Sequence, residues 1–316
     1  MAMKDLFILT LVFQCNMKHF FCFLIILTLS SCSVLKPHKS AVKNIIEHFE
    51  NENGKVMIVA HRANIYDSLP ENSLEGIKAC IANNIDIIEI DIRRTKDGVL
   101  IVMHDETLNR MTNGKGQVGE FTWDQLSQLY LREGNYGRIT SYRIPRLDEV
   151  FAICKGKVML NLDKGFWFLN DASKLAEEMG VSQQIILKSF ETREQIDAQI
   201  GSFSALTFMP ILAENSFNNL SILPNYLDDK KGYIPEAFEL IFDEPTDSIG
   251  QQSFINSLKQ HGARTWVNSL SNGLSGGRGE KENTKKNWQA TIDLGVTILQ
   301  TDRCLELRQF LNETNQ

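Results

Sequence analysis

Residues 85–92 read IDIIEIDI, an apolar run of strand-forming residues that carries Glu89 and Asp91 towards its carboxyl-terminal end. An apolar run of this length predicts a strand buried on both faces, as in parallel sheets covered by helices. Glu89 and Asp91 lie two positions apart, so their side chains project to the same side of the strand. The run therefore predicts a sheet covered by helices on both faces, with a candidate functional site at Glu89 and Asp91.

Seven further short runs share this character, and helical periods separate most of them. The expected strands are 56–61, 85–92, 158–163, 185–190, 205–212, 238–243, 264–268 and 296–301. Helical periodicity covers 73–83, 171–179, 193–200, 248–261 and 284–294. Eight alternating units predict an α/β fold, a (β/α)8 TIM barrel. A doubly wound open sheet is the alternative, but the chain lacks the glycine-rich phosphate loops typical of that fold.

One additional β-rich run, residues 99–104, breaks the alternation. It follows the second strand too closely for a helical crossover, and Asp97-Gly98 favours a hairpin turn. An antiparallel return brings His104 to the level of Asp91. Residues 105–146 are then expected to form a small insertion over the carboxyl-terminal face of the barrel, with one helical piece near 123–130.

The carboxyl-terminal ends of barrel strands face the functional site. The first strand ends at His61-Arg62, and an imidazole beside a guanidinium suits acid–base work on a phosphate-bearing substrate. Buried carboxylates repel each other unless a cation lies between them. Glu89 and Asp91 therefore favour a hard divalent ion over an ion pair with the two arginines that end their strand.

Other strand ends supply further candidates. His104 ends the hairpin return, and Asp163 ends the next apolar strand, where it adds a third carboxylate at the same level. Lys188 is a candidate cation for a substrate phosphate. Trp266 is a candidate for an aromatic wall of the substrate site. An ordinary packing role inside the barrel is an equal alternative for this residue. Oxygen ligands without cysteine or nearby paired histidines favour Ca²⁺ or Mg²⁺ over zinc.

The motifs at these positions follow a known order. The chain resembles the glycerophosphodiester phosphodiesterase family in His61-Arg62, Pro70-Glu71-Asn72-Ser73, Glu89-Ile90-Asp91, Thr95-Lys96-Asp97-Gly98, His104-Asp105, Ile144-Pro145-Arg146-Leu147-Asp148-Glu149 and Thr301-Asp302. The resemblance implies a TIM barrel related to phosphatidylinositol-specific phospholipases C. It also implies a phosphoric diester hydrolase that converts small-molecule glycerophosphodiesters to glycerol 3-phosphate and an alcohol.

The resemblance also assigns roles within the site. It implies two catalytic histidines, His61 and His104, and places Arg62 on the phosphate. It further implies one divalent cation, Ca²⁺ or Mg²⁺, held by three carboxylates: Glu89, Asp91 and Asp163.

Two departures from the family pattern bear on the site. Ala63 stands where a glycine usually follows His-Arg, which restricts the backbone of the first loop. Asp163 replaces a glutamate, and Lys164 follows it directly instead of two positions on. We expect Lys164 to point away from Asp163, which leaves Lys188 to supply the cation.

These departures keep two alternative functions open. One is a lipid-anchored phosphodiester-binding protein that has lost turnover. The other is an enzyme of the same barrel that acts on another phosphodiester, such as a lysophospholipid or a cell-wall polymer. The aromatic run 166–168 beside Asp163 would hold such a bulkier group.

Residues 1–31 have the charged, apolar and small-residue regions of a signal peptide, and Met17 offers an alternative start. The sequence Leu29-Ser30-Ser31-Cys32 resembles a bacterial lipobox. We therefore expect lipidation of Cys32 and an exported protein anchored to a bacterial membrane through its lipid. Residues 32–54 are expected to form a tether, and 55–316 the barrel.

Charge and cysteine content limit the partners. The chain has 33 Lys and Arg against 39 Asp and Glu, with no basic run interleaved with aromatics, which argues against nucleic acid as a partner. Cys80, Cys154 and Cys304 lie in or beside amphipathic helical stretches. They are expected to be buried reduced thiols and not a disulfide framework.

Overall fold

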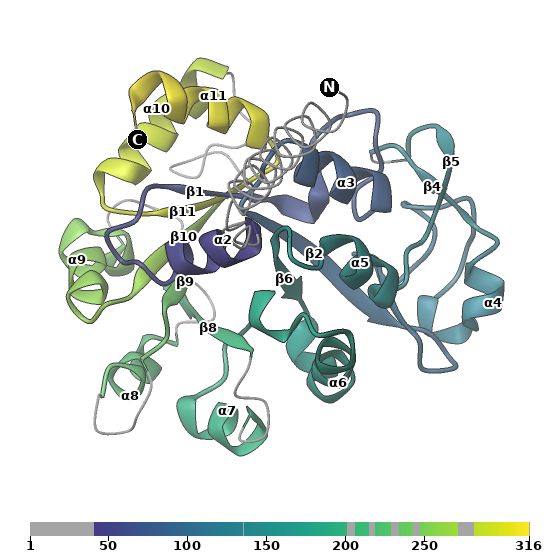
Figure 1. The fold of residues 1–316 in the computed structure, drawn as a ribbon, viewed down its shortest axis with the longest axis horizontal. Helices are drawn as coiled ribbons and strands as arrows, with labels where there is room; N and C mark the ends of the chain where they lie inside the picture. Colours follow the sequence, from purple (N-terminus) through teal and green to yellow (C-terminus); the bar gives the residue numbers. More distant parts are fainter. Residues whose placement is uncertain are drawn as a thin grey trace, which may run out of the picture. The chain divides into compact units, whose positions relative to one another are not determined.

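The protein is described by a computed structural model that covers residues 41–134, 136–200, 206–214, 219–228, 234–242, 247–270 and 281–315. Eight parallel strands form a closed ring (Figure 1). In chain order they are β1 (Met57–Ala60), β2 (Ile87–Arg94), β6 (Met159–Asp163), β7 (Ile185–Ser189), β8 (Thr207–Ala213), β9 (Ala237–Ile241), β10 (Arg264–Ser269) and β11 (Ile298–Thr301). The predicted TIM barrel is confirmed.

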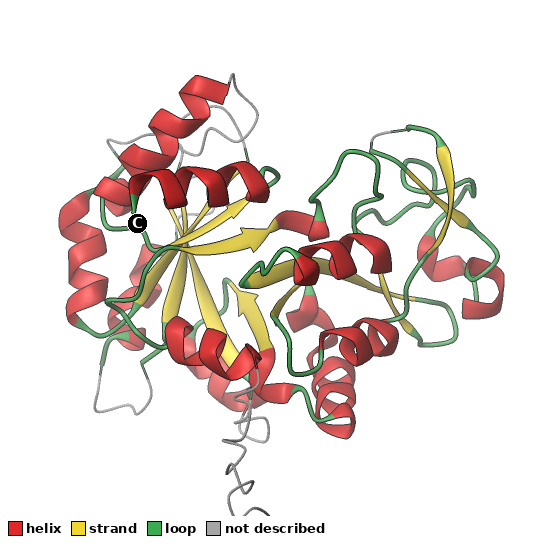
Figure 2. Cartoon of the chain, turned by 45° about the horizontal axis from the view of Figure 1, so that its top comes forward, coloured by secondary structure: helices red, strands yellow, loops and turns green. Residues whose placement is uncertain are grey.

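Helices surround this ring, with the strands enclosed between them (Figure 2). They are α3 (Leu74–Ala82), α5 (Leu147–Cys154), α6 (Leu169–Met179), α7 (Arg193–Ile200), α8 (Leu223–Tyr226), α9 (Gln252–Gln260), α10 (Lys281–Asp293) and α11 (Cys304–Thr314). Local signals set their ends: the Ser73 hydroxyl caps α3 by accepting from Gly76 N, and Gly180 ends α6 with a φ of 65°.

Alternate residues of each strand serve different cores. The outward residues, such as Ile88, Ile90 and Leu160, are buried under the helices in the main hydrophobic cluster. The first inward residues form a second apolar cluster inside the ring, with Met57, Ile87, Met159, Ile186, Met209, Ala237, Trp266 and Ile298. This second cluster, here called the floor, closes the amino-terminal end of the barrel.

Helix α2 (Ala41–Phe49) covers the floor (Figure 1). Its apolar residues recur at helical spacing, so that Val42 and Phe49 are buried against the inward residues of the strands. The Arg264 guanidinium donates to the carbonyl oxygens of His48 and Lys55 behind it. Residues 41–49, which the sequence analysis placed in the tether of 32–54, thus form a helix packed on the barrel.

The predicted hairpin is confirmed in its register. Strand β3 (Leu100–Val102) pairs antiparallel with β2, with Val102 opposite Ile92, and Met103 N donates to Asp91 O over 2.9 Å. Gly98 makes the turn with a φ of 88°.

The insertion that follows lies on the β2 side of the barrel (Figure 1). It contains α4 (Trp123–Leu126), β4 (Tyr130–Arg132) and β5 (Ile139–Arg143), which pack on a small apolar core of their own. The helix is shorter than predicted because β4 begins at Tyr130.

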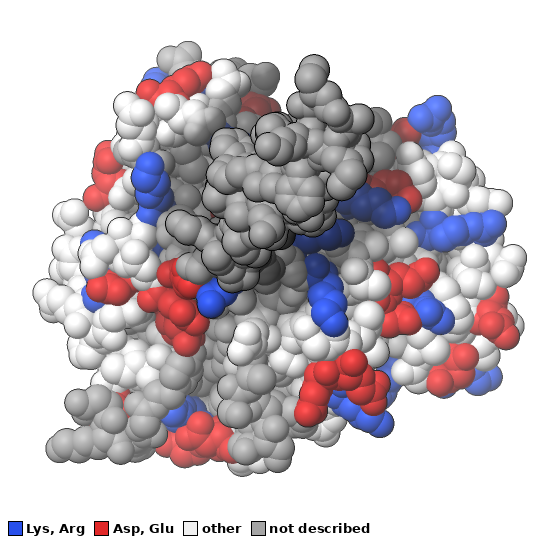
Figure 3. All heavy atoms as spheres, viewed as in Figure 1, with Lys and Arg blue, Asp and Glu red and all other residues white. Residues whose placement is uncertain are grey.

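The predicted signal peptide of 1–31 and the lipidation site Cys32 lie outside the described residues. Among the helices described, none has the length and apolar character to cross a bilayer. The three predicted core cysteines are buried free thiols, as expected. On the face seen in Figure 3, the described Lys and Arg side chains are interspersed with Asp and Glu.

Candidate functional site

The first histidine of the site, His61, follows β1 in the 3-10 turn His61–Ala63 and is 8% exposed. Its Nδ1 lies 2.7 Å from Oδ1 of Asp302, which follows the neighbouring strand β11. Burial lowers the pKa of His61, but the hydrogen bond to Asp302 and the negative charge of Glu89 outweigh it, so this pKa lies above its ordinary value. Asp302 thus orients the ring and leaves Nε2 for other partners.

The second histidine, His104, is oriented in the same way. Its Nδ1 lies 2.7 Å from Oδ1 of Asp105. Arg110 of the insertion donates to both oxygens of Asp105 and reaches Glu71 Oε1 at 2.8 Å. The hydrogen bond from Arg110 is the largest influence on Asp105 and lowers its pKa to about 2.

Three carboxylates converge beside the histidines. Glu89 and Asp91 come from β2 and Asp163 from β6, and one oxygen from each lies within 4.8 Å of the others. Asp91 and Asp163 are direct partners in the sheet register. Burial and the negative charge of the neighbouring Asp91 raise the pKa of Glu89.

The donor set of this cluster suits a hard divalent cation. All three side chains offer oxygen, and Glu89 and Asp91 are 2% and 1% exposed. Asn161, two residues before Asp163 on the same face of β6, is fully buried. Its Oδ1 accepts no hydrogen bond from the described residues. These residues therefore fit a bound metal ion.

The alternative ion pairs do not form. Arg93 donates to the His104 carbonyl oxygen, and Arg94 pairs with Asp171 on α6. Neither arginine neutralises the carboxylate cluster.

Asn72 and Arg62 hold the cluster from the β1 side. Asn72 Nδ2 donates to Asp91 Oδ2 over 3.0 Å, and Asn72 Oδ1 accepts from the Asp91 backbone. The Arg62 backbone donates to Glu89 Oε2 over 2.7 Å, and its Nε lies 3.5 Å from Asp91 Oδ2. The predicted phosphate cation therefore lies at the cluster.

The first loop carries backbone strain. Arg62 and Ala63 have φ values of 52° and 54°, in the left-handed region that favours glycine. Such conformations typically cost about 1–3 kcal/mol each and occur mostly at functional sites. The expected restriction at Ala63 is thus visible in the backbone.

The expectation for Lys164 is wrong. Its Nζ lies 2.7 Å from Asp91 Oδ1 and 3.4 Å from Asp163 Oδ2, inside the cluster. Simple strand alternation fails here because Lys164, the residue after β6, has φ 61° and ψ 3°, which turns its side chain inward.

Lys188 points into the barrel, between the carboxylate cluster and the floor. Its Nζ lies 2.9 Å from Glu239 Oε2 and 3.5 Å from Asp163 Oδ1. Burial lowers the pKa of Lys188, but Glu239, Asp163 and Glu89 outweigh it, so this pKa lies above its ordinary value. The sequence analysis missed Glu239, although a lone carboxylate within the apolar strand β9 is the same signal that identified Glu89.

Trp266 lies in the floor and is fully buried, so ordinary barrel packing describes it and an exposed aromatic wall does not. Its Nε1 donates to Asn268 Oδ1 over 2.9 Å, and Asn268 donates in turn to Glu239 over 2.7 Å. The indole therefore supports Lys188 through Asn268 and Glu239.

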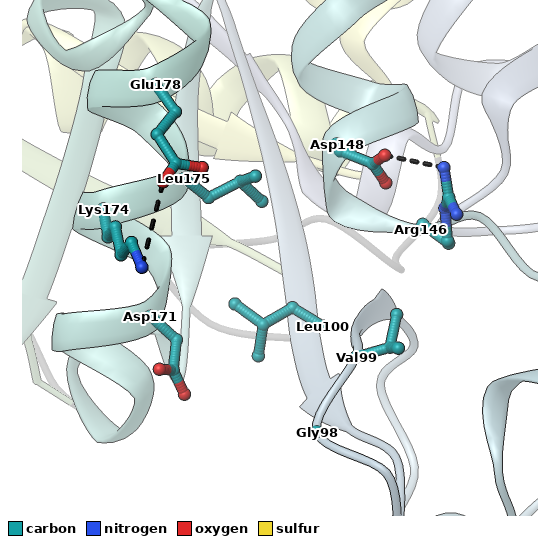
Figure 4. Close-up of a pocket in the computed structure, with 9 residues that line it drawn as sticks. All are labelled: Gly98, Val99, Leu100, Arg146, Asp148, Asp171, Lys174, Leu175 and Glu178. Atoms are coloured by element: carbon teal, nitrogen blue, oxygen red, sulfur yellow. Dashed lines mark hydrogen bonds and ion pairs between the residues drawn. The ribbon is translucent and has the colours of Figure 1, made fainter.

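A separate cavity of about 320 Å³ lies between the hairpin turn and helices α5 and α6 (Figure 4). Leu100 and Leu175 line it together with charged side chains. Those charges pair locally: Arg146 with Asp148, Lys174 with Glu178, and Asp171 with Arg94. The two histidines and the three clustered carboxylates do not line it, so it is distinct from the candidate site.

The fold and these groups define a class: TIM-barrel proteins with two carboxylate-oriented histidines and a carboxylate cluster at the carboxyl-terminal ends of their strands. Comparison with family models then matches residues 61–305 to the glycerophosphoryl diester phosphodiesterase family. The chain belongs to this family.

Curated relatives match over part of their length. A glycerophosphodiester phosphodiesterase of Caldanaerobacter subterraneus subsp. tengcongensis is 32% identical over 143 residues, which cover 43% of this chain and 58% of the relative. Human glycerophosphodiester phosphodiesterase 1 is 33% identical over 102 residues, or 32% of this chain and 30% of the relative. The chain thus spans less than two thirds of these relatives.

Solved structures share the fold. A glycerophosphoryl diester phosphodiesterase from Parabacteroides distasonis superposes with a TM-score of 0.73 at 23% identity, covering 87% of this chain and 93% of the other. An Oleispira antarctica phosphodiesterase in complex with the product sn-glycerol-3-phosphate has a TM-score of 0.56 at 17% identity, covering 81% and 96%.

Proposed function

We propose that the protein hydrolyses glycerophosphodiesters to glycerol 3-phosphate and an alcohol. The observation that carries this proposal is the pair of histidines, each held through Nδ1 by a carboxylate, beside three clustered carboxylates. The family match and the names of the relatives support the same reaction.

In this proposal the two histidines move the protons. Because Asp302 and Asp105 engage Nδ1 of His61 and His104, each Nε2 is left to exchange a proton with substrate. One ring takes a proton from the nucleophile, and the other gives one to the leaving oxygen. The nucleophile is either water or the 2-hydroxyl of the substrate glycerol; in the second case a cyclic phosphate forms, and water then opens it to glycerol 3-phosphate. Arg62 and Lys164 supply positive charge for the phosphate.

We further propose that Glu89, Asp91 and Asp163 hold one divalent ion, Ca²⁺ or Mg²⁺. Their oxygen donors and mutual repulsion favour such an ion. When bound, the ion supplies positive charge that stabilises the phosphoryl oxygens in the transition state.

The alternatives rest on two observations. The left-handed Ala63 suits a binding protein in which the first loop has lost its usual glycine. Trp167, which is 71% exposed on the turn after Asp163, suits an enzyme that accepts a bulkier phosphodiester. The binding protein predicts no turnover of any diester. The enzyme for a bulkier phosphodiester predicts turnover that favours large substrates.

A product assay separates the three functions. Release of glycerol 3-phosphate from several glycerophosphodiesters is measured with and without a chelator, and a lysophospholipid is the bulky comparison. We expect His61→Ala and His104→Ala each to lose about 10²–10⁴-fold in rate while the fold persists by circular dichroism. His261→Ala, at the exposed end of α9, is the matched control. Full activity in either folded site variant would exclude that histidine from the mechanism, and no turnover on any diester would favour the binding protein.

We also propose export and anchoring to a bacterial membrane through a lipid on Cys32, which the lipobox-like sequence supports. Eight residues would then separate the lipid from α2, a link of about 30 Å at most. Because α2 covers the floor, so short a link favours an active site that faces the water and takes soluble diesters. Mass spectrometry of the membrane-extracted protein tests this proposal, and an unmodified Cys32 in a soluble form would contradict it.

A further inference from the structure

Lys164 occupies the position of a cation within the carboxylate cluster. Its Nζ contacts Asp91 Oδ1 at 2.7 Å and lies 3.4 Å from Asp163 Oδ2, with 17% of its side chain exposed. Two of the three candidate metal ligands therefore already share one positive charge from the chain itself.

The local backbone is arranged to deliver this ammonium group. Lys164 adopts a left-handed conformation that residues other than glycine rarely adopt. At the next position, a Cβ on Gly165 would lie 2.7 Å from Leu187 Cδ2 and 2.8 Å from Leu162 Cβ. A side chain at position 165 would therefore displace these leucines, whereas position 164 presents its ammonium group to the cluster without such a clash.

The second buried lysine differs in its partners. Lys188 lies closest to Glu239, at 2.9 Å, so it keeps a carboxylate of its own when the cluster binds another cation. Among the described residues, Lys164 forms ion pairs with Asp91 and Asp163 only. A divalent ion on those oxygens would repel the Lys164 ammonium and replace it as their counter-charge.

We propose that Lys164 is an internal counter-cation that competes with the divalent ion for Asp91 and Asp163. In the metal-free protein it bridges the two carboxylates, and metal binding displaces it towards the open end of the barrel, where the phosphate of the substrate binds. This inference rests on the proposed metal site. It adds that Lys164 lowers the affinity of the site for the divalent ion.

Calorimetric titration of the metal-stripped full chain with Ca²⁺ alone, and with Mg²⁺ alone, tests the competition. Lys164→Met keeps the length of the side chain and removes its charge, and Lys164→Arg keeps the charge. Lys174→Met, on the exposed face of α6, is the control. We expect Lys164→Met to bind Ca²⁺ about tenfold more tightly than the wild type, within the range typical of linked sites. The arginine and control variants should bind like the wild type.

A second readout needs no variant. Acetylation of lysines by an amine-reactive ester, followed by mass spectrometry, should label Lys164 faster when Ca²⁺ is present and leave the rate at Lys174 unchanged. Unchanged or weaker Ca²⁺ binding in Lys164→Met, or a labelling rate at Lys164 that Ca²⁺ does not raise, would overturn the inference while the metal site stands. If the wild type and Lys164→Met bind neither ion and hydrolysis survives chelation, the proposed metal dependence itself fails.

Discussion

Glu239 offers the sharpest test of how the buried charges are held. Glu239 is 2% exposed and Lys188 is 7% exposed, and they pair at 2.9 Å inside the barrel. Glu239→Ala would strand the Lys188 ammonium and remove the acceptor of Asn268. Loss of one partner of a buried pair typically costs about 3–5 kcal/mol of unfolding free energy. Asp163 remains 3.5 Å from Lys188, so we expect a value near the lower end, about 3 kcal/mol.

Urea unfolding followed by circular dichroism measures this loss, provided that the m-value is unchanged. The double variant Lys188→Met, Glu239→Met removes both charges, and it should recover most of the stability lost in Glu239→Ala. Glu178→Ala removes an exposed partner of Lys174 and should cost no more than about 1 kcal/mol. If Glu239→Ala were as stable as Glu178→Ala, or if the double variant were no more stable than Glu239→Ala, the buried pair would not hold the site as argued.

Three further predictions follow from the site. Asp302→Asn should lower the pKa of His61, because the hydrogen bond that raises it loses its charge; NMR titration of the imidazole measures this, and an unchanged pKa would contradict the pairing. The depressed pKa of Asp105 stabilises the fold above its unfolded value of about 3.9 and ceases to do so as the pH falls towards 2. Asp105→Asn should therefore flatten the acid limb of the stability curve, and an unaltered limb would refute that contribution. Asp163→Asn should weaken Ca²⁺ affinity and turnover together, with Asp163→Glu retaining part of both; a normal metal titration of Asp163→Asn would exclude it as a ligand.

The barrel itself was predictable because its strands carry strong local signals. Apolar runs such as β2 and β6 were located within two residues, and the Asp97-Gly98 turn was sufficient to set the hairpin register. Helix α2 was placed in the tether because its apolar face is short and finds a partner only when the ring of strands has closed. The β4–β5 pair was missed because β4 has only three residues and β5 is a largely exposed, mostly polar strand.

The candidate site was predictable where strand periodicity alone places a side chain. The three carboxylates of the cluster met as expected, because each ends or precedes the end of a parallel strand. Lys164 was misplaced because one left-handed residue reverses the direction that alternation predicts. Asp302 was given no role, since its partner His61 lies 241 positions away and only the closed fold brings them together. Arg110 was missed because its insertion has no strand periodicity to place it, although Asp105 is only five positions away.

The alternation within β2 explains how one strand serves both stability and chemistry. Ile88, Ile90 and Ile92 are fully buried on the outer side, where they pack under the helices and contribute to the core. Glu89 and Asp91 face inward above the apolar floor, where each meets a donor or a cation from another strand or loop. Since the outer side and the floor supply the apolar burial, the inward positions above them are free to carry charge. A carboxylate inside an otherwise apolar barrel strand therefore points to a functional site, because the fold does not require a charge there. The groups that pair with the carboxylate indicate its role in that site.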